Sequence, residues 1–78
     1  MVEPESIEQS IRAGLAVTHV AVTGDGAHFE AVIVSPKFAG LNRVRQHQLV
    51  YAALGDRMRE EIHALSMKTF SPEEWAAR

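Results

Sequence analysis

Cysteine is absent from this sequence of 78 residues. Its absence excludes disulfides and a metal site made only of thiolates from this chain alone. The sequence also lacks an apolar run near the ~20 residues that a membrane span needs, and its N-terminus lacks the apolar segment of a signal peptide. We therefore expect a cytoplasmic protein that does not insert into membranes.

Charge of either sign is not in large excess, because the formal net charge is −2. A chain with this balance has no overall attraction to nucleic acid, so such binding would need a local basic patch. No Ser/His/Asp order, cysteine nucleophile or glycine-rich phosphate loop is present. We therefore do not expect an enzyme.

Hydrophobic residues make up 46% of the sequence, but only one Trp, one Tyr and three Phe are among them. A chain of this length buries roughly 60% of its unfolded surface, so its core is thin. We expect one domain that spans residues 1–78.

The longest helical pattern lies in the second half of the chain. Apolar residues recur there at every fourth position, at Val50, Leu54, Met58 and Ile62. This spacing predicts one helix from Asn42 to Glu61, with Asn42 as a fair N-cap. Within it, Gly55 costs roughly 1 kcal/mol relative to Ala and is expected to mark close packing rather than a break.

Upstream, Pro4 suits a first helical turn and Gly14 a helix stop, which predicts a helix to about Ala13. Two segments rich in β-branched residues follow, and Gly24-Asp25-Gly26 between them suits a tight turn. The sequence therefore predicts a hairpin of strands at residues 17–23 and 27–35.

Downstream, the segment 64–70 is the third predicted strand. Ser71, Pro72 and Glu74 form a strong helix start, and Trp75 is the expected anchor of that last helix. The order is α-β-β-α-β-α. A hairpin followed by a βαβ crossover gives a mixed three-stranded sheet, so the fold class is an α+β two-layer sandwich.

Two histidines and an aspartate are expected at one end of this sheet. His28 and His63 open strands that the crossover makes parallel, and Asp25 lies in the turn at the same end. His47, near the start of the long helix, belongs to the opposite end. Imidazole with a carboxylate suits Zn or Fe. The alternative is that His63 is a favoured residue at a helix C-terminus and His28 an ordinary surface residue.

Three cations, Lys37, Arg43 and Arg45, surround the start of the long helix. A helix N-terminus with nearby cations can hold phosphate. On these residues alone, an ordinary solvated surface is the preferred interpretation.

Five segments, in this order, resemble the BolA family. They are Phe29–Ser35 (FEAVIVS), Phe38–Gly40 (FAG), Arg45–Tyr51 (RQHQLVY), Ile62–Thr69 (IHALSMKT) and Ser71–Trp75 (SPEEW). Together they span nearly the whole chain, and the short GDGAHF turn is similar to that of the compact bacterial members. The family fold is αββαβα and related to the class II KH fold, in agreement with the predicted order.

The resemblance implies a non-enzymatic partner of monothiol glutaredoxins, monomeric when isolated and without a cofactor of its own. In that family a heterodimer holds a [2Fe-2S] cluster: glutaredoxin supplies its cysteine and a bound glutathione thiol, and the BolA-like chain supplies a histidine, here His63. Relatives add a Cys or His from the first hairpin loop. The Cys position corresponds to Asp25 here, so His28, Asp25 or neither is the second ligand.

The same family is described as a DNA-binding regulator of stress response and cell morphology. That function would involve the segment from Phe38 through the long helix, with Lys37, Arg43 and Arg45 nearby. The segment Gly40-Leu41-Asn42-Arg43 lacks the GXXG loop with which KH domains hold nucleic acid. DNA binding is therefore the second hypothesis.

Overall fold

The computed structural model describes residues 2–78, which form four α-helices, a short 3₁₀ helix and three strands. The order agrees with the prediction apart from the 3₁₀ helix and one extra α-helix. Along the chain the elements are α1 (Pro4–Gly14), β1 (His19–Gly24), β2 (His28–Val34), η1 (Pro36–Phe38), α2 (Arg43–Leu54), α3 (Arg57–Glu60), β3 (Ala64–Phe70) and α4 (Pro72–Ala77). Among these residues no helix is long and apolar enough to cross a membrane.

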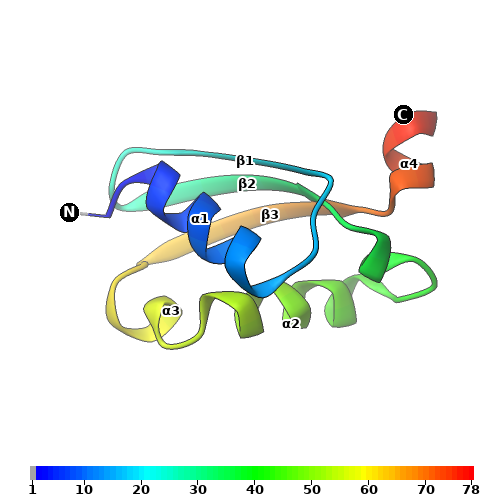
Figure 1. Cartoon of the computed structure of the whole chain (residues 1–78). Helices are drawn as coiled ribbons and strands as arrows, with labels where there is room; N and C mark the ends of the chain where they lie inside the picture. The colour runs from blue at the N-terminus through cyan, green and yellow to red at the C-terminus, as the bar shows by residue number, and fades with distance from the viewer. Residues whose placement is uncertain (1) are drawn as a thin grey trace.

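The three strands form one mixed sheet in the order β1-β2-β3. β1 and β2 are antiparallel, with His19 opposite Val34, and β2 and β3 are parallel, with His28 opposite Ala64. The helices α1 and α2 lie side by side on one face of this sheet (Figure 1). The predicted α+β fold with a hairpin and a parallel crossover is therefore confirmed.

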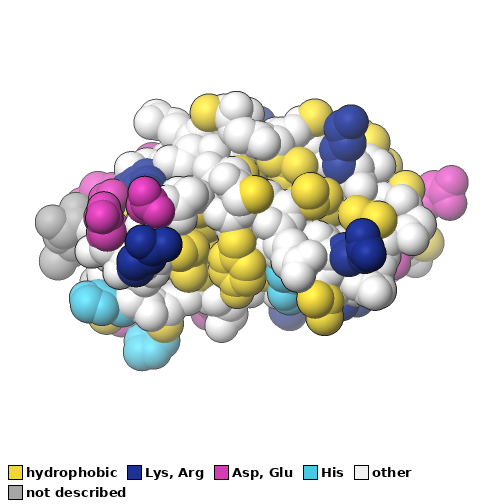
Figure 2. Space-filling model, turned by 90° about the horizontal axis from the view of Figure 1, so that it is seen from below, with side chains coloured by type: hydrophobic (Ala, Val, Ile, Leu, Met, Phe, Trp, Pro, Cys, Tyr) yellow, Lys and Arg dark blue, Asp and Glu magenta, His cyan; other side chains and the backbone are white. Residues whose placement is uncertain are grey.

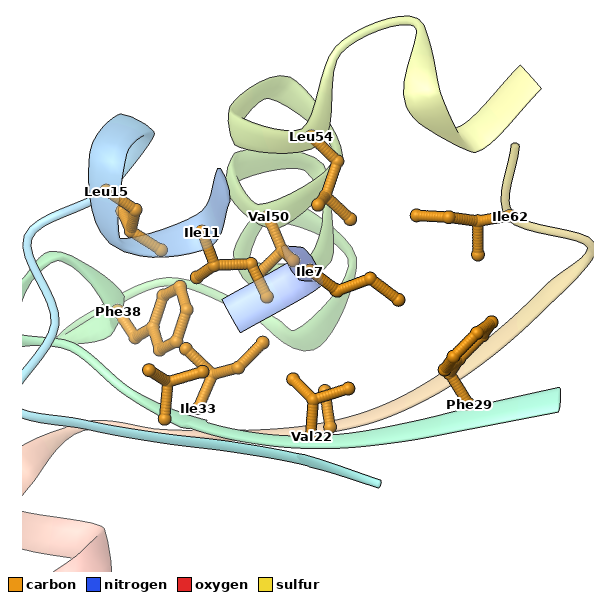
Figure 3. Packing of buried hydrophobic residues seen from close by; sticks show 12 residues of the cluster. Ile7, Ile11, Leu15, Val22, Phe29, Ile33, Phe38, Val50, Leu54 and Ile62 are labelled. Atoms are coloured by element: carbon orange, nitrogen blue, oxygen red, sulfur yellow. The ribbon is translucent and has the colours of Figure 1, made fainter. Parts of the chain in front are cut away.

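The core lies between that face and the two helices (Figure 3). Alternate residues of β2 point into it, because successive side chains of a strand face opposite sides. Ile7 and Ile11, one helical turn apart, supply the inner face of α1. The most deeply buried hydrophobic residues of this cluster are Ile7, Ile11, Phe29, Ala31, Ile33, Phe38 and Val50.

The prediction of one continuous helix from Asn42 to Glu61 is wrong, because the helix breaks at Gly55. This residue follows α2 with φ of +59° and ψ of −137°, a conformation that is essentially restricted to glycine. Nothing lies within 4 Å of the position that a Cβ would occupy there. Gly55 therefore serves as a backbone turn and not as a close-packing contact, and α3 starts in a new direction.

The short helix α4 packs at one end of the sheet, where the predicted cap and anchor are both present. Ser71 and Glu74 form a capping box. The Trp75 ring stacks on His19 with ring centroids 5.0 Å apart and lies 5.3 Å from Phe70. His19 alternates along β1 with the core residue Val20, so Trp75 reaches the sheet face opposite α1 and α2.

One buried hydrogen-bond network ties α2 to its surroundings. The Gln46 amide nitrogen donates to the carbonyls of Phe38 and Leu41, at 3.2 and 2.9 Å. Its amide oxygen accepts from the Thr69 hydroxyl at 2.6 Å. A single side chain thus joins the loop after η1, the helix α2 and the end of β3.

Candidate functional site

The parallel pairing of β2 and β3 brings His28 and His63 to the same end of the sheet. His28 is the first residue of β2 and is aligned with Ala64, which His63 directly precedes. Both histidines are exposed. Histidine side chains gather at one end of the face shown in Figure 2. The sequence-based placement of these two residues therefore agrees with the strand register.

Asp25 lies at the same end, but its carboxylate already has a structural role. One of its oxygens accepts hydrogen bonds from the backbone N–H groups of Ala27 and His28, both at 2.9 Å. These two bonds lower the pKa of Asp25, and the bond from the His28 N–H has the larger effect. Because the carboxylate holds the turn and stays ionised, it also fixes the backbone where His28 begins.

The chemistry of this end of the sheet fits part of a metal-binding site. Within residues 2–78, no group of three or more His, Cys, Asp or Glu side chains is placed to hold a metal ion. Two exposed imidazoles at one end can still act as ligands, because neutral imidazole binds Fe and Zn well. A metal or cluster held here would need further ligands from another molecule.

The cations singled out in the sequence gather at the other end of the sheet. Lys37 lies in η1, and Arg43 and Arg45 lie in the first turn of α2; all three are exposed. Asn42 caps α2 by accepting a hydrogen bond from the Arg45 backbone N–H at 2.9 Å. In the described part of the chain the ion pairs involve only Arg57 and Arg59, so these three side chains are available to an anion.

A hollow of about 420 Å³ lies at this same end, between the loop after β2 and the start of α4. Its lining includes Pro36, Phe38, Leu41, Pro72 and Glu73. Sequence reasoning missed this hollow. The sequence marks two helix starts with a proline, but nothing near either start predicts that the two starts come together in space.

His47 is a second feature that the sequence did not reveal. Its ring is half-buried on α2, and its Nε2 atom has no hydrogen-bond partner among the described residues. Desolvation, together with the positive charge of Arg43, lowers the pKa of His47. The structure thus favours the neutral ring at this position, away from the two histidines of the other end.

Comparisons with known proteins agree with the fold and with the order of the segments. The family model described as BolA-like protein matches residues 2–74. The chain is 37% identical to "Acid stress protein IbaG" of Escherichia coli strain K12 over 75 residues, which cover 95% of this chain and 89% of that protein. It is 40% identical to "DNA-binding transcriptional regulator BolA" of Haemophilus influenzae over 60 residues, which cover 77% and 58%.

Among solved structures, a BolA protein homologue from Coxiella burnetii superposes with a TM-score of 0.89. The two sequences are 47% identical, and the match covers 97% of this chain and 99% of that one. The similarity therefore extends over the whole described fold, both ends of the sheet included.

Proposed function

We propose a function from one premise, that this chain belongs to the BolA family. The protein is a non-enzymatic partner of a monothiol glutaredoxin, and the two chains share a [2Fe-2S] cluster. His63 is the ligand from this chain. The observation that carries the proposal is that His28 and His63 are both exposed at one end of the sheet, while no group of three or more His, Cys, Asp or Glu side chains in the described residues could hold a metal without a partner.

The division of ligands follows from what each chain contains. This chain has no cysteine, so every thiolate comes from the partner: its own cysteine and a bound glutathione. Histidine in place of thiolate on one iron raises the reduction potential of a [2Fe-2S] cluster. The shared cluster should therefore be easier to reduce than a cluster held by glutaredoxin and glutathione alone.

Reconstitution with glutaredoxin, glutathione, iron and sulfide tests the role of His63. Visible absorption and circular dichroism report the cluster, and far-ultraviolet dichroism checks that each variant is folded. We expect His63→Ala to change the visible spectrum and to lower the stability of the heterodimer, whereas Lys68→Ala, an exposed change in the strand that follows His63, has no effect. A spectrum unchanged by His63→Ala would remove His63 from the site.

The second ligand is assigned to His28 in this proposal. Imidazole binds iron readily, whereas a carboxylate is a hard ligand and a poorer match to an iron that carries sulfide. Asp25 is further disfavoured because its oxygen accepts two backbone hydrogen bonds. Electron paramagnetic resonance of the reduced cluster should change with His28→Ala and not with Asp25→Asn. The reverse result would exchange the two assignments, and two unchanged signals would leave His63 as the sole ligand.

DNA binding is the second candidate function, because one relative is named a DNA-binding transcriptional regulator and three exposed cations surround the start of α2. Contacts to phosphate release counterions, so affinity should fall steeply with salt. Labelled duplex is titrated at two salt concentrations with the parent and with the double variant Arg43→Ala, Arg45→Ala. Binding that is absent near physiological salt, or equal for both proteins, would eliminate this function.

A further inference from the structure

One edge of the strand β3 is not paired with any other strand of the described chain. It is the last strand of the sheet and pairs only with β2. The Ser35 backbone N–H donates to the Phe70 carbonyl at 3.1 Å, so the peptide groups of Phe70 and of alternate residues before it face β2. The peptide groups of Leu65, Met67 and Thr69 therefore face outward, and none of them has a hydrogen-bond partner in residues 2–78.

The β3 edge has few of the features that normally prevent an edge strand from pairing with a strand of another molecule. Natural edges are usually protected by charges, prolines, bulges or very short length. β3 has seven residues, no proline and no acidic residue, and its pairing with β2 continues without a bulge from Ala64 to Phe70. Its one charged residue, Lys68, lies on the sheet face away from α2, between the inward-facing Met67 and Thr69.

An exposed apolar stripe on α2 runs beside the same edge. Val44, His47 and Tyr51 follow one another at helical spacing, and Val44 and Tyr51 are 66% and 42% exposed. On α2, Tyr51 is about 160° around the axis from Ala53, which faces Gly14 of α1. The stripe therefore lies on the side of α2 away from α1. Hydrophobic side chains also gather across the middle of the face shown in Figure 2.

The other edge of the sheet lacks such a flank. β1 is accompanied by α1, whose exposed residues are Glu5, Gln9, Arg12, Ala13 and Gly14. The large exposed hydrophobic residues of the described chain are both on α2. An apolar flank combined with unpaired peptide groups is thus a property of the β3 edge.

We propose that β3 pairs antiparallel with β3 of a second copy of this chain, about a two-fold axis at Met67. In this register Met67 lies opposite itself and Leu65 lies opposite Thr69, so every outward peptide group meets another outward peptide group. The edge is therefore complementary to itself, which is what a two-fold interface requires. The result is one sheet that continues through both copies.

The charges also match in this register. Ser66 faces Lys68 of the second copy, so no lysine lies opposite a lysine. Because α2 runs antiparallel to β3, the two-fold axis sets the start of α2, with Arg43, near the α3 end of the other copy. The carboxylate of Glu60 is exposed there, beside the ion pair of Asp56 and Arg59. The helix dipoles of the two copies are antiparallel as well. This arrangement departs from the monomer that we expected from the sequence.

Single cysteines test the register directly, because the chain has none of its own. Residues at a pair without hydrogen bonds have Cα atoms ~4.5 Å apart, which is within disulfide range. Under mild oxidation, Ser66→Cys mixed with Lys68→Cys should form a mixed dimer at least tenfold faster than either variant alone, as mass spectrometry will show. Met67→Cys should link to itself. Rapid self-linking of Ser66→Cys would overturn the register.

Sedimentation equilibrium tests the dimer itself. Met67→Pro removes an N–H that has no bond within the chain, so the variant should stay folded by circular dichroism and dissociate at least tenfold more readily. Met67→Ala keeps the N–H and is the matched control, expected to dimerise. A parent protein that stays monomeric at millimolar concentration, or equal dimerisation of the two variants, overturns the proposal. Neither experiment involves glutaredoxin or iron, so the outcome is independent of the proposed function.

Discussion

At the scale of single residues, Gln46 has the most consequential polar side chain of the interior. It is 5% exposed; its hydrogen bonds to Phe38 and Thr69 are buried, and the one to Leu41 is partly buried. Leaving a buried donor or acceptor unpaired costs about 1–3 kcal/mol for each group. Loss of this side chain would leave groups unpaired in the loop after η1 and in β3 at the same time.

Gln46→Leu should therefore lower the free energy of unfolding by roughly 3 kcal/mol. Thr69→Val removes only one bond of the network and should cost about half as much. Urea unfolding measures both losses. An unchanged slope of the unfolding free energy against urea concentration would show that the effect is on stability alone. Equal costs for the two variants would contradict the assigned network.

His47 should make stability depend on pH. Its pKa in the folded state is below the ordinary value of 6.5, so the unfolded chain binds the proton more readily. Stability should therefore fall as the pH drops below about 6.5, and the loss should level off below the pKa of the folded state. His47→Gln removes this contribution. Urea midpoints at pH 7.5 and pH 5 should differ more for the parent than for the variant, and equal differences would contradict the prediction.

At the scale of the elements, the break at Gly55 decides how the helical layer is built. Beyond it, the Arg57 guanidinium donates to the Ser6 carbonyl at 3.1 Å and to the Ser10 hydroxyl at 2.8 Å. These bonds attach α3 to α1. Ile62, which the helical spacing placed on the same stripe as Val50, reaches the core from the segment after α3.

Gly55→Ala should destabilise the fold by about 1–3 kcal/mol, the typical cost of such a backbone conformation for an L-residue. Space is not the cause, because a Cβ there would meet nothing within 4 Å. A synthetic chain with D-alanine at this position is the matched control, because a D-residue favours positive φ and should be as stable as the parent. Thermal melts measure all three chains, and an equal loss for both alanines would indicate a steric cause.

The sequence was sufficient for the elements whose signals are local. Ser71 and Pro72 marked the start of α4, and the β-branched segments marked the hairpin. The parallel register followed from chain order, so the common end of His28 and His63 was predictable as well. The break at Gly55 was not, because the apolar spacing continues to Ile62 and a propensity cost of roughly 1 kcal/mol is compatible with an unbroken helix. Contacts between α3 and α1 decide that the helix breaks at Gly55.

Removal of α4 tests whether this helix belongs to the cooperative unit. A chain that ends after Phe70 loses the Trp75 ring, and Val34, which is fully buried and lies opposite both His19 and Phe70, should become exposed. Because Trp75 is itself half-exposed, the cost should be below the ~3–5 kcal/mol of a fully buried tryptophan. We expect a loss of about 2 kcal/mol and a melting midpoint lower by roughly 10 °C. An unchanged midpoint would mean that α4 is only tethered to the sheet.

At the scale of the whole molecule, the sheet separates two chemical ends. His28, His63 and the Asp25 turn lie where β2 and β3 begin, and the three cations lie where these strands finish. The longest dimension of the molecule is 35 Å, several times the screening length of about 8 Å at physiological salt. Charges at one end should therefore have little direct effect on the other.

Variants at the two ends should consequently act independently. His63→Ala should alter the shared cluster and leave any affinity for duplex DNA unchanged, and the pair Arg43→Ala, Arg45→Ala should do the reverse. The cluster spectrum and the DNA affinity, measured for each variant, test whether the two ends are independent. Loss of both properties in either variant would mean that the two ends are coupled, and a melt of that variant would show whether unfolding is the reason.

The position of Trp75 gives the protein an optical reporter for one of its two ends. It is the only tryptophan, and it stacks between His19 and the Arg78 guanidinium, which lies 3.4 Å from the ring centroid. A molecule that docks near α4 or the adjacent cations would disturb this stack and shift the emission. A molecule that docks at His63 would leave the emission constant while its own signals change. Fluorescence of the unmodified protein can therefore show which end a new partner occupies before any variant is made.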